Sequence, residues 1–376
     1  SLRRVADAPG RQIKEVRLYP YFFPDVFKKG GDPLGESIRN WVRIRRAMLR
    51  SPVDRIGYGG YLSLALKFPK FVEHVAGLCN QFRAIRDVSR KGASWKAPIT
   101  VGVLSAWGKP RSWVNSKGVG FKFGERNTAS NVLECLAGLP VNVRFLSFDD
   151  IRKMGIPKDM DIILNEGDAG SAWSGGRQWG DPKIITAIRR WIHSGGSFLG
   201  IGGPSAFEHQ GRFFQLSDVM GVQCETGESI SSPGLTFAAA KKHFILEDSP
   251  APTLGDTKTN VFVSEPETAV LLASEAHVCM AARKSGKGRA VFMSGLPYSL
   301  ENSRLLLRSL FWCAGRESEL HRCFVSNPLT DCAVFEKAGI LAVTNNSDKK
   351  ESTVLYDNKG RARRLTLRPY ELRWIN

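Results

Sequence analysis

Short apolar runs alternate with amphipathic stretches along the first quarter of the chain. Apolar residues spaced three and four positions apart predict helices over 37–49 and 68–88, and shorter runs at 15–20 and 54–57 predict strands. Strand–helix–strand–helix is typical of parallel β/α units. Two such units cannot close a barrel or bury a sheet on both faces. We therefore expect residues 1–96 to be one part of a larger β/α fold.

A second β/α pattern follows a linker at 91–98. It predicts five buried strands, over 99–105, 141–146, 161–165, 197–201 and 290–294, with helices over 130–136, 183–192 and 301–314. The stretch between about 204 and 260 is less regular. Short buried strands alternating with helices are typical of a doubly wound parallel sheet, and we expect one over 97–316.

The last stretch, 317–376, changes character. Short alternating runs predict strands over 333–335, 340–343, 352–356, 364–368 and 371–375. Turn signals rich in Asn, Asp, Ser and Gly separate several of them. This pattern predicts a small antiparallel β domain.

The charge is strongly positive and unevenly distributed. The net charge is +18, and residues 1–96 hold 20 Lys and Arg against 8 Asp and Glu. Such a surplus fits nucleic acid, an anionic substrate, an acidic partner segment or a solvated basic surface. The chain has no RNP motif, no zinc finger and no basic helix with interleaved aromatic residues, so we expect no nucleic-acid partner.

Cysteine usage and the chain start bear on the cellular setting. The seven cysteines form no CxxC pair and most lie in apolar stretches, which predicts reduced, buried thiols in a cytoplasmic protein. The six histidines are scattered, so we expect no metal site. No run approaches the ~18 apolar residues of a membrane helix. The chain opens on Ser1 without an apolar leader, and we expect it to begin inside a longer protein.

Two neighbouring features of the first 96 residues could bind an anion. Arg17 lies on a predicted strand whose C-terminal end should open into a barrel mouth, where a guanidinium could hold a phosphate or sugar oxygen, and Tyr21 could stack on a sugar. Gly59 and Gly60 follow the second strand and precede a helix, a place where backbone N–H groups can approach a phosphate. A structural ion pair with core aromatics, and a tight turn, are the alternatives.

A polar and aromatic rim follows the strands of the second pattern. Trp107, Trp113 and Trp173 lie just after predicted strands, where parallel sheets bind ligands. They could flank a sugar, or they could pack between domains. Class I glutamine amidotransferases share this layout and place a nucleophilic Cys after such a strand. Residues 200–204 here read Gly-Ile-Gly-Gly-Pro, so we expect no nucleophilic catalysis from this domain.

Several long motifs carry a family resemblance. The stretches are 17–25, 45–52, 55–65, 107–113, 171–176, 211–216 and 295–299. They closely resemble the 1,3-β-galactosyl-N-acetylhexosamine phosphorylases, the lacto-N-biose/galacto-N-biose phosphorylases of glycoside hydrolase family 112. The resemblance covers essentially the whole chain. It implies the C-terminal remnant of a (β/α)8 barrel over 1–96, a class I glutamine-amidotransferase-like domain over 97–316 and a β domain over 317–376.

The resemblance also implies a reaction. The family inverts the anomeric centre while phosphate splits a β-1,3-galactosyl-N-acetylhexosamine into galactose 1-phosphate and N-acetylhexosamine. It places Arg17 at a phosphate-binding arginine, with Tyr21 in the same wall; Gly59 and Gly60 come from the glycine pattern alone. The inventory of acids is thin, since only Asp25 and Asp32 lie near the first loop. By resemblance the general acid lies upstream of residue 1, so we expect the chain alone to be inert.

The partners and the alternatives follow from the same resemblance. It implies inorganic phosphate and a galactosyl-N-acetylhexosamine disaccharide as partners, no cofactor, no membrane and a cytoplasmic homodimer. A galactosyl-rhamnose phosphorylase of the same family and a non-catalytic carbohydrate-binding module stay open. An amidotransferase-like hydrolase is disfavoured by the missing nucleophile at 200–204.

Overall fold

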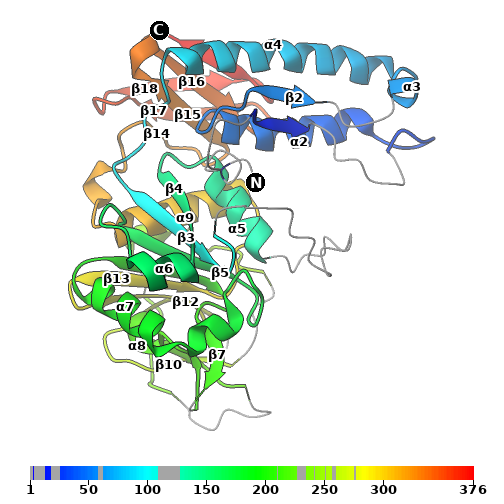
Figure 1. Ribbon diagram of the computed structural model, residues 1–376. Coiled ribbons are helices and arrows are strands. Elements are labelled where there is room, and N and C mark those ends of the chain that lie inside the picture. Colours follow the sequence, from blue (N-terminus) through cyan, green and yellow to red (C-terminus); the bar gives the residue numbers. More distant parts are fainter. Residues whose placement is uncertain are drawn as a thin grey trace. The chain divides into compact units, whose positions relative to one another are not determined.

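The chain folds into two compact units, and each is described by itself (Figure 1). The computed structural model describes Arg3 and residues 13–17, 26–57, 62–108, 128–209, 211–226, 234–240, 242–249, 251–255, 260–274 and 277–376. Unit 1 combines Ser1–Trp95, Ala137–Pro140 and His321–Asn376. Unit 2 combines Lys96–Leu136 and Val141–Leu320. The two ends of the chain therefore belong to the same unit.

Unit 2 is built on a seven-stranded sheet of order β11-β12-β13-β6-β5-β3-β4. The five parallel strands are β3 (Thr100–Ser105), β4 (Asn142–Ser147), β5 (Ile162–Gly167), β6 (Ser197–Gly202) and β13 (Gly288–Met293). In chain order these strands lie 2-1-3-4-5, the order of flavodoxin-like doubly wound sheets. The expectation of parallel strands from this part of the sequence is confirmed.

Antiparallel strands extend this sheet. β11 (Ala269–Ser274) and β12 (His277–Ser285) pair with each other, and β12 pairs with β13. Shorter pairs form from β7 (Ala206–His209) with β8 (Arg212–Phe214), and from β9 (Val222–Cys224) with β10 (Val261–Val263). The sequence did not predict these strands, because their buried runs lack the regular alternation that marks a half-buried strand.

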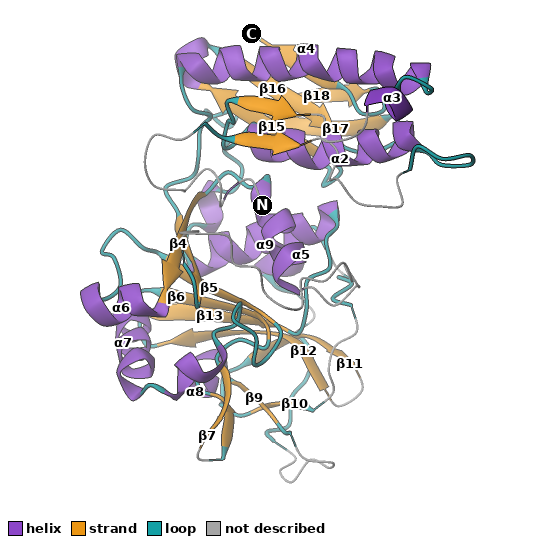
Figure 2. Cartoon of the chain, turned by 45° about the vertical axis from the view of Figure 1, so that its right-hand side comes forward, coloured by secondary structure: helices purple, strands orange, loops and turns teal. Residues whose placement is uncertain are grey.

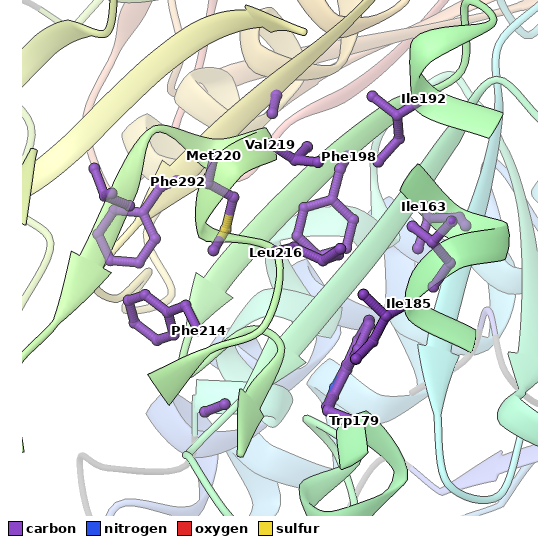
Figure 3. Close-up of a cluster of buried hydrophobic side chains, with 14 of the residues drawn as sticks. Ile163, Trp179, Ile185, Ile192, Phe198, Phe214, Leu216, Val219, Met220 and Phe292 are labelled. Carbon is purple, nitrogen blue, oxygen red and sulfur yellow. The ribbon is translucent and has the colours of Figure 1, made fainter. Parts of the chain in front are cut away.

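Helices cover both faces of the unit 2 sheet (Figure 2). They are α5 (Thr128–Ala137), α6 (Phe148–Met154), α7 (Pro182–His193), α8 (Ser217–Met220) and α9 (Leu300–Cys313). On one face α7 and α8 bury a core around Trp179, Phe198, Phe214 and Phe292 (Figure 3). α9 packs against β6 and β13. Strands buried on both faces read as continuous apolar runs, which is why the sequence revealed them.

The first part of unit 1 holds the predicted parallel β/α units. It contains β1 (Glu15–Arg17), α2 (Pro33–Met48), β2 (Arg55–Gly57), α3 (Leu62–Ala65) and α4 (Pro69–Lys91). β1 and β2 pair in parallel, as expected. Asp32 caps α2, because its side chain accepts a hydrogen bond from Gly35 N at 2.8 Å and Pro33 follows it.

The second part of unit 1 is antiparallel. β14 (Phe324–Val325), β17 (Glu351–Tyr356) and β18 (Ala362–Leu367) form one three-stranded sheet. β15 (Thr330–Phe335), β16 (Ile340–Asn345) and β19 (Leu372–Ile375) form another. All their pairs are antiparallel, as the alternating pattern predicted.

The two parts of unit 1 share one hydrophobic core. Trp41 and Met48 of α2 and Phe82 of α4 pack in one cluster with Phe335 of β15 and Ala342 of β16. The helices that follow β1 and β2 are therefore covered by the C-terminal sheet (Figure 1). Amphipathic spacing shows that a helix buries one face, but it does not show which distant segment covers that face.

Candidate functional site

Arg17, one of the predicted phosphate-binding residues, lies on β1, and its register partner is Gly57 of β2. Tyr21, Gly59 and Gly60 lie outside the described residues. We call the paired positions Arg17 and Gly57 the phosphate edge.

The two strands are supported differently on their two faces. Val16 and Ile56 are register partners, and both pack against the shared core of unit 1. Glu15 and Arg55 are also partners, and the Arg55 Nε lies 2.6 Å from the Glu15 Oε2. Alternation places this ion pair on the face away from the core. This ion pair was not predicted from the sequence, although opposite charges at the starts of two predicted parallel strands could have indicated it.

The two carboxylates that the sequence places near the first loop are Asp25 and Asp32. The Asp32 side chain caps α2, and its Oδ2 lies 3.8 Å from the Arg39 Nη1. Asp25 lies outside the described residues. The capping role makes Asp32 a structural residue, because its side chain already accepts a hydrogen bond from the helix that it caps.

The two predicted sugar-stacking tryptophans meet in unit 2. Trp107 follows β3 and Trp173 follows β5, and their ring centroids lie 5.0 Å apart at 84°, an edge-to-face pair. Ala106 N donates to Ala172 O at 2.9 Å, which joins the two loops directly. Both rings are half-buried. The structure thus brings together the two tryptophans that the sequence selected separately, while Trp113 lies outside the described residues.

A fully buried amide holds the loop that carries Trp173. Asn165 Nδ2 donates to Leu104 O at 3.2 Å and to Ser174 O at 3.0 Å. Its Oδ1 accepts from Ser205 N at 2.9 Å. Trp179 Nε1 also donates to Ser174 O, at 2.6 Å. Asn165 therefore links the ends of three neighbouring strands, a role that its place at a strand end could have suggested.

The end of β6 leaves little room for a side chain at Gly202. Gly202 has φ +83°, and a Cβ there would lie 2.8 Å from Gly167 O. Gly203 N donates to the same carbonyl at 2.8 Å. A non-glycine residue would be strained in backbone and in contact. The glycine at this position is a structural requirement of the turn.

Four arginines of the first segment are buried instead of solvated. They are Arg3, Arg45, Arg46 and Arg50. Burial lowers the pKa of Arg3 to about 9 and that of Arg45 to about 10, so both remain charged near neutral pH. For these four residues the prediction of a solvated basic surface is wrong. Their donors bind mainly backbone carbonyls, and a sequence carries no mark of such acceptors.

The described residues show no sign of metal or membrane chemistry. None of their side chains forms a group of three or more His, Cys, Asp or Glu that could hold a metal ion. No helix in the described part of the chain is long and apolar enough to cross a membrane. No disulfide joins the seven cysteines, all of which lie in the described part of the chain, and burial raises the pKa of Cys323 to about 12.

The fold and these edges define an α/β protein in which a parallel β/α segment precedes a doubly wound domain and a small β domain. Sequence models of the lacto-N-biose phosphorylase family match all three parts. The N-terminal TIM barrel domain matches residues 1–97, the central domain 100–318 and the C-terminal domain 324–375. The chain belongs to the lacto-N-biose phosphorylase family.

Curated relatives extend this finding. A 1,3-beta-galactosyl-N-acetylhexosamine phosphorylase of Lachnoclostridium phytofermentans is 41% identical over 100% of the chain and 52% of its own length. One of Bifidobacterium longum is 38% identical over 94% of the chain and 51% of its own length. A D-galactosyl-beta-1->4-L-rhamnose phosphorylase of L. phytofermentans is 33% identical over 90% and 47%. The chain spans about half the length of the curated relatives it matches.

Among solved structures, a cold-adapted β-galactosidase from Rahnella sp. R3 matches with a TM-score of 0.44 and 13% identity, over 81% of this chain and 44% of that one. A likeness of this size does not define an architecture.

Proposed function

We propose that the chain supplies the phosphate-binding side of a phosphorylase. The reaction is inverting phosphorolysis of β-1,3-galactosyl-N-acetylhexosamine to galactose 1-phosphate and N-acetylhexosamine. The observation that carries this proposal is the register of β1 and β2, which sets Arg17 beside Gly57 at the start of the glycine loop. An arginine can hold a phosphate oxygen, and we expect the glycines that follow Gly57 in the sequence to offer backbone N–H groups to the same anion. The family membership and the names of the relatives support the same reaction.

The chemistry needs a nucleophile, a cationic site and an acid. A phosphate oxygen attacks the galactosyl C1, the C1–O bond to the hexosamine breaks, and a carboxylic acid gives its proton to the leaving oxygen. Arg17 would orient the phosphate and balance its charge. Neither Asp32 nor Glu15 is placed as the acid, since Asp32 caps a helix and Glu15 is paired with Arg55. The proposal places the acid in barrel units that precede residue 1 in an intact enzyme.

Two alternatives rest on specific observations. The relative that acts as a galactosyl-rhamnose phosphorylase is 33% identical, so rhamnose is a possible acceptor for the intact site. The edge-to-face pair of Trp107 and Trp173 is a half-buried aromatic surface that fits a sugar ring, as in a non-catalytic carbohydrate-binding module. Under the main proposal the same two rings contact the disaccharide.

The experiment joins the chain to the part of its L. phytofermentans relative that it does not match. That part is placed ahead of Ser1, and the chimera and the chain alone are assayed for galactose 1-phosphate. The expected result is phosphate-dependent release by the chimera and none by the chain alone. Disaccharides ending in N-acetylhexosamine and in rhamnose are compared. A folded chimera that releases no galactose 1-phosphate from any β-galactoside would sink the proposal.

Further features of the intact protein belong to this proposal. We place domain boundaries after residues 96 and 316, and the family-model matches support these positions. We propose that the central domain is amidotransferase-like in layout but without a nucleophile; its strand order and Gly202 support this. The homodimer, the cytoplasmic location and function without a cofactor follow from the family resemblance.

A further inference from the structure

The helix after β1 is tied to the C-terminal β domain by a buried arginine. Arg45 of α2 is 0% exposed. Its Nη1 donates to Tyr370 O at 2.8 Å, and its Nη2 donates to Asn345 O at 2.8 Å and to Asn346 Oδ1 at 3.1 Å. A guanidinium is a planar fork of donors, so three acceptors fix its direction as well as its position.

Neighbouring arginines add ties between the same two segments. Arg46 Nε lies 2.5 Å from Asp331 Oδ2, and Asn346 Nδ2 donates to the same oxygen at 2.9 Å. Arg50, two residues after α2, donates to Cys332 O of the C-terminal domain and, at 3.1 Å, to Gly138 O, which lies outside that domain. Removing the partner of a buried charged donor costs more free energy than removing an ordinary hydrogen bond. The end of α2 is therefore held firmly against this domain.

The phosphate edge depends on the same helix. β1 and β2 form only three register pairs, and an isolated pair of strands is marginally stable. Val16 and Ile56 of these strands pack against the cluster that α2, α4 and the C-terminal sheet share. The position of Arg17 at the end of β1 is therefore set by side chains that the C-terminal domain itself holds.

We propose that Arg45 is a positioning residue for phosphate, through which the C-terminal β domain fixes α2 and, with it, the β1 end that carries Arg17. This inference rests on the proposed function, because it assumes that Arg17 binds phosphate. It assigns the C-terminal domain a part in phosphate binding without any contact to phosphate. Arg45 acts by geometry, so a substitution that keeps its charge still disturbs the edge.

The test is a titration of the full chain with inorganic phosphate, followed by ³¹P NMR. Arg45→Lys keeps the charge but loses the fork, and Asn346→Ala removes one acceptor more gently. Arg39→Lys is the matched control, because it makes the same change on an exposed part of α2, where Arg39 is 56% exposed. Each variant is checked by circular dichroism at the temperature of the titration. Arg17→Ala, alone and combined with Arg45→Lys, completes a double-mutant cycle.

The expected result is about tenfold weaker phosphate binding for Arg45→Lys and a smaller loss for Asn346→Ala, with Arg39→Lys unchanged. In the Arg17→Ala background, Arg45→Lys should add nothing further, which a general loss of stability would not produce. If Arg45→Lys does not fold, Asn346→Ala decides. Folded variants that bind phosphate as tightly as the original chain overturn this inference and leave the phosphate edge standing. Phosphate binding that is absent, or unaffected by Arg17→Ala, overturns the edge and this inference together.

Discussion

Arg45 donates a hydrogen bond to the backbone carbonyl of Asn345, a residue 300 positions later in the chain. This contact joins the helix after the first strand to the C-terminal β domain. It makes the two ends of the chain one structural unit, although the sequence places a whole doubly wound domain between them. The proposed positioning of the phosphate edge depends on this contact between the two ends of the chain in unit 1.

The shared core of unit 1 predicts a large cost for losing Phe335. This side chain of β15 is 1% exposed and packs in one cluster with Trp41 and Phe82 of the helices. Phe335→Ala should lower the free energy of unfolding by about 3–5 kcal/mol, because it leaves a cavity between helix and sheet. Urea unfolding measures this. Met154→Ala, at a side chain 76% exposed, should change little; equal effects would contradict the packing.

The geometry at Gly202 predicts that a cysteine nucleophile cannot be introduced there without destabilising the chain. Gly202→Cys should destabilise the chain and give no glutaminase activity, since its Cβ would lie 2.8 Å from Gly167 O at φ +83°. Gly155→Cys is the matched control, because Gly155 has φ +73° with nothing near its Cβ position. Thermal unfolding should show the larger loss at Gly202. Equal losses would mean that only the backbone angle matters, and glutaminase activity would reopen the hydrolase alternative.

A partly buried ion pair in unit 2 predicts a dependence of stability on pH. Burial alone would raise the pKa of the Asp248 carboxyl, but the hydrogen bond from Arg308 and the charge of Arg304 outweigh it, so the pKa lies below its ordinary value. Arg308 Nε donates to Asp248 Oδ2 at 2.7 Å. The stabilisation is therefore present above the ordinary carboxyl pKa and is lost as pH falls through the lowered one.

Asp248→Asn tests this dependence. The variant should be less stable than the original chain near neutral pH, and the difference should shrink as the pH falls below the ordinary carboxyl pKa. Urea unfolding at several pH values gives the comparison. Asp159→Asn, at a carboxylate 66% exposed, serves as the control and should show little difference at any pH. A difference for Asp248→Asn that stays constant with pH would contradict the assignment.

The tryptophan pair predicts a sugar response in unit 2. If Trp107 and Trp173 contact the disaccharide, galactosyl-N-acetylhexosamine should quench tryptophan fluorescence, and Trp173→Ala should abolish most of the change. Trp191→Ala removes another half-buried tryptophan, on α7, and should leave the sugar response intact. Loss of the edge-to-face contact should also cost about 1 kcal/mol beyond the area that the ring buries. Quenching that persists in Trp173→Ala would assign the response elsewhere.

The sequence was sufficient for much of the fold but for less of the site. Parallel strands such as β5 and β6 are continuous apolar runs, and the alternation of β17 and β18 marks an antiparallel sheet. The cover of α2 and α4 by the C-terminal sheet could not be predicted, because a pattern does not say which distant surface meets it. The burial of the four arginines could not be predicted either, because arginines in a sequence suggest a solvated basic surface. The backbone carbonyls that accept their hydrogen bonds have no sequence signature. Arg17 was correctly expected to lie on a strand; its role in phosphate binding stays a prediction.

The central claim is that Arg17 holds phosphate at the edge it shares with the glycine loop. The most direct measurement is the apparent KM for inorganic phosphate of the chimera described above, with and without Arg17→Ala. The account predicts that the substitution raises the phosphate KM by about tenfold or more while the disaccharide KM changes by less than about threefold. An unchanged phosphate KM in a folded, active variant would contradict it.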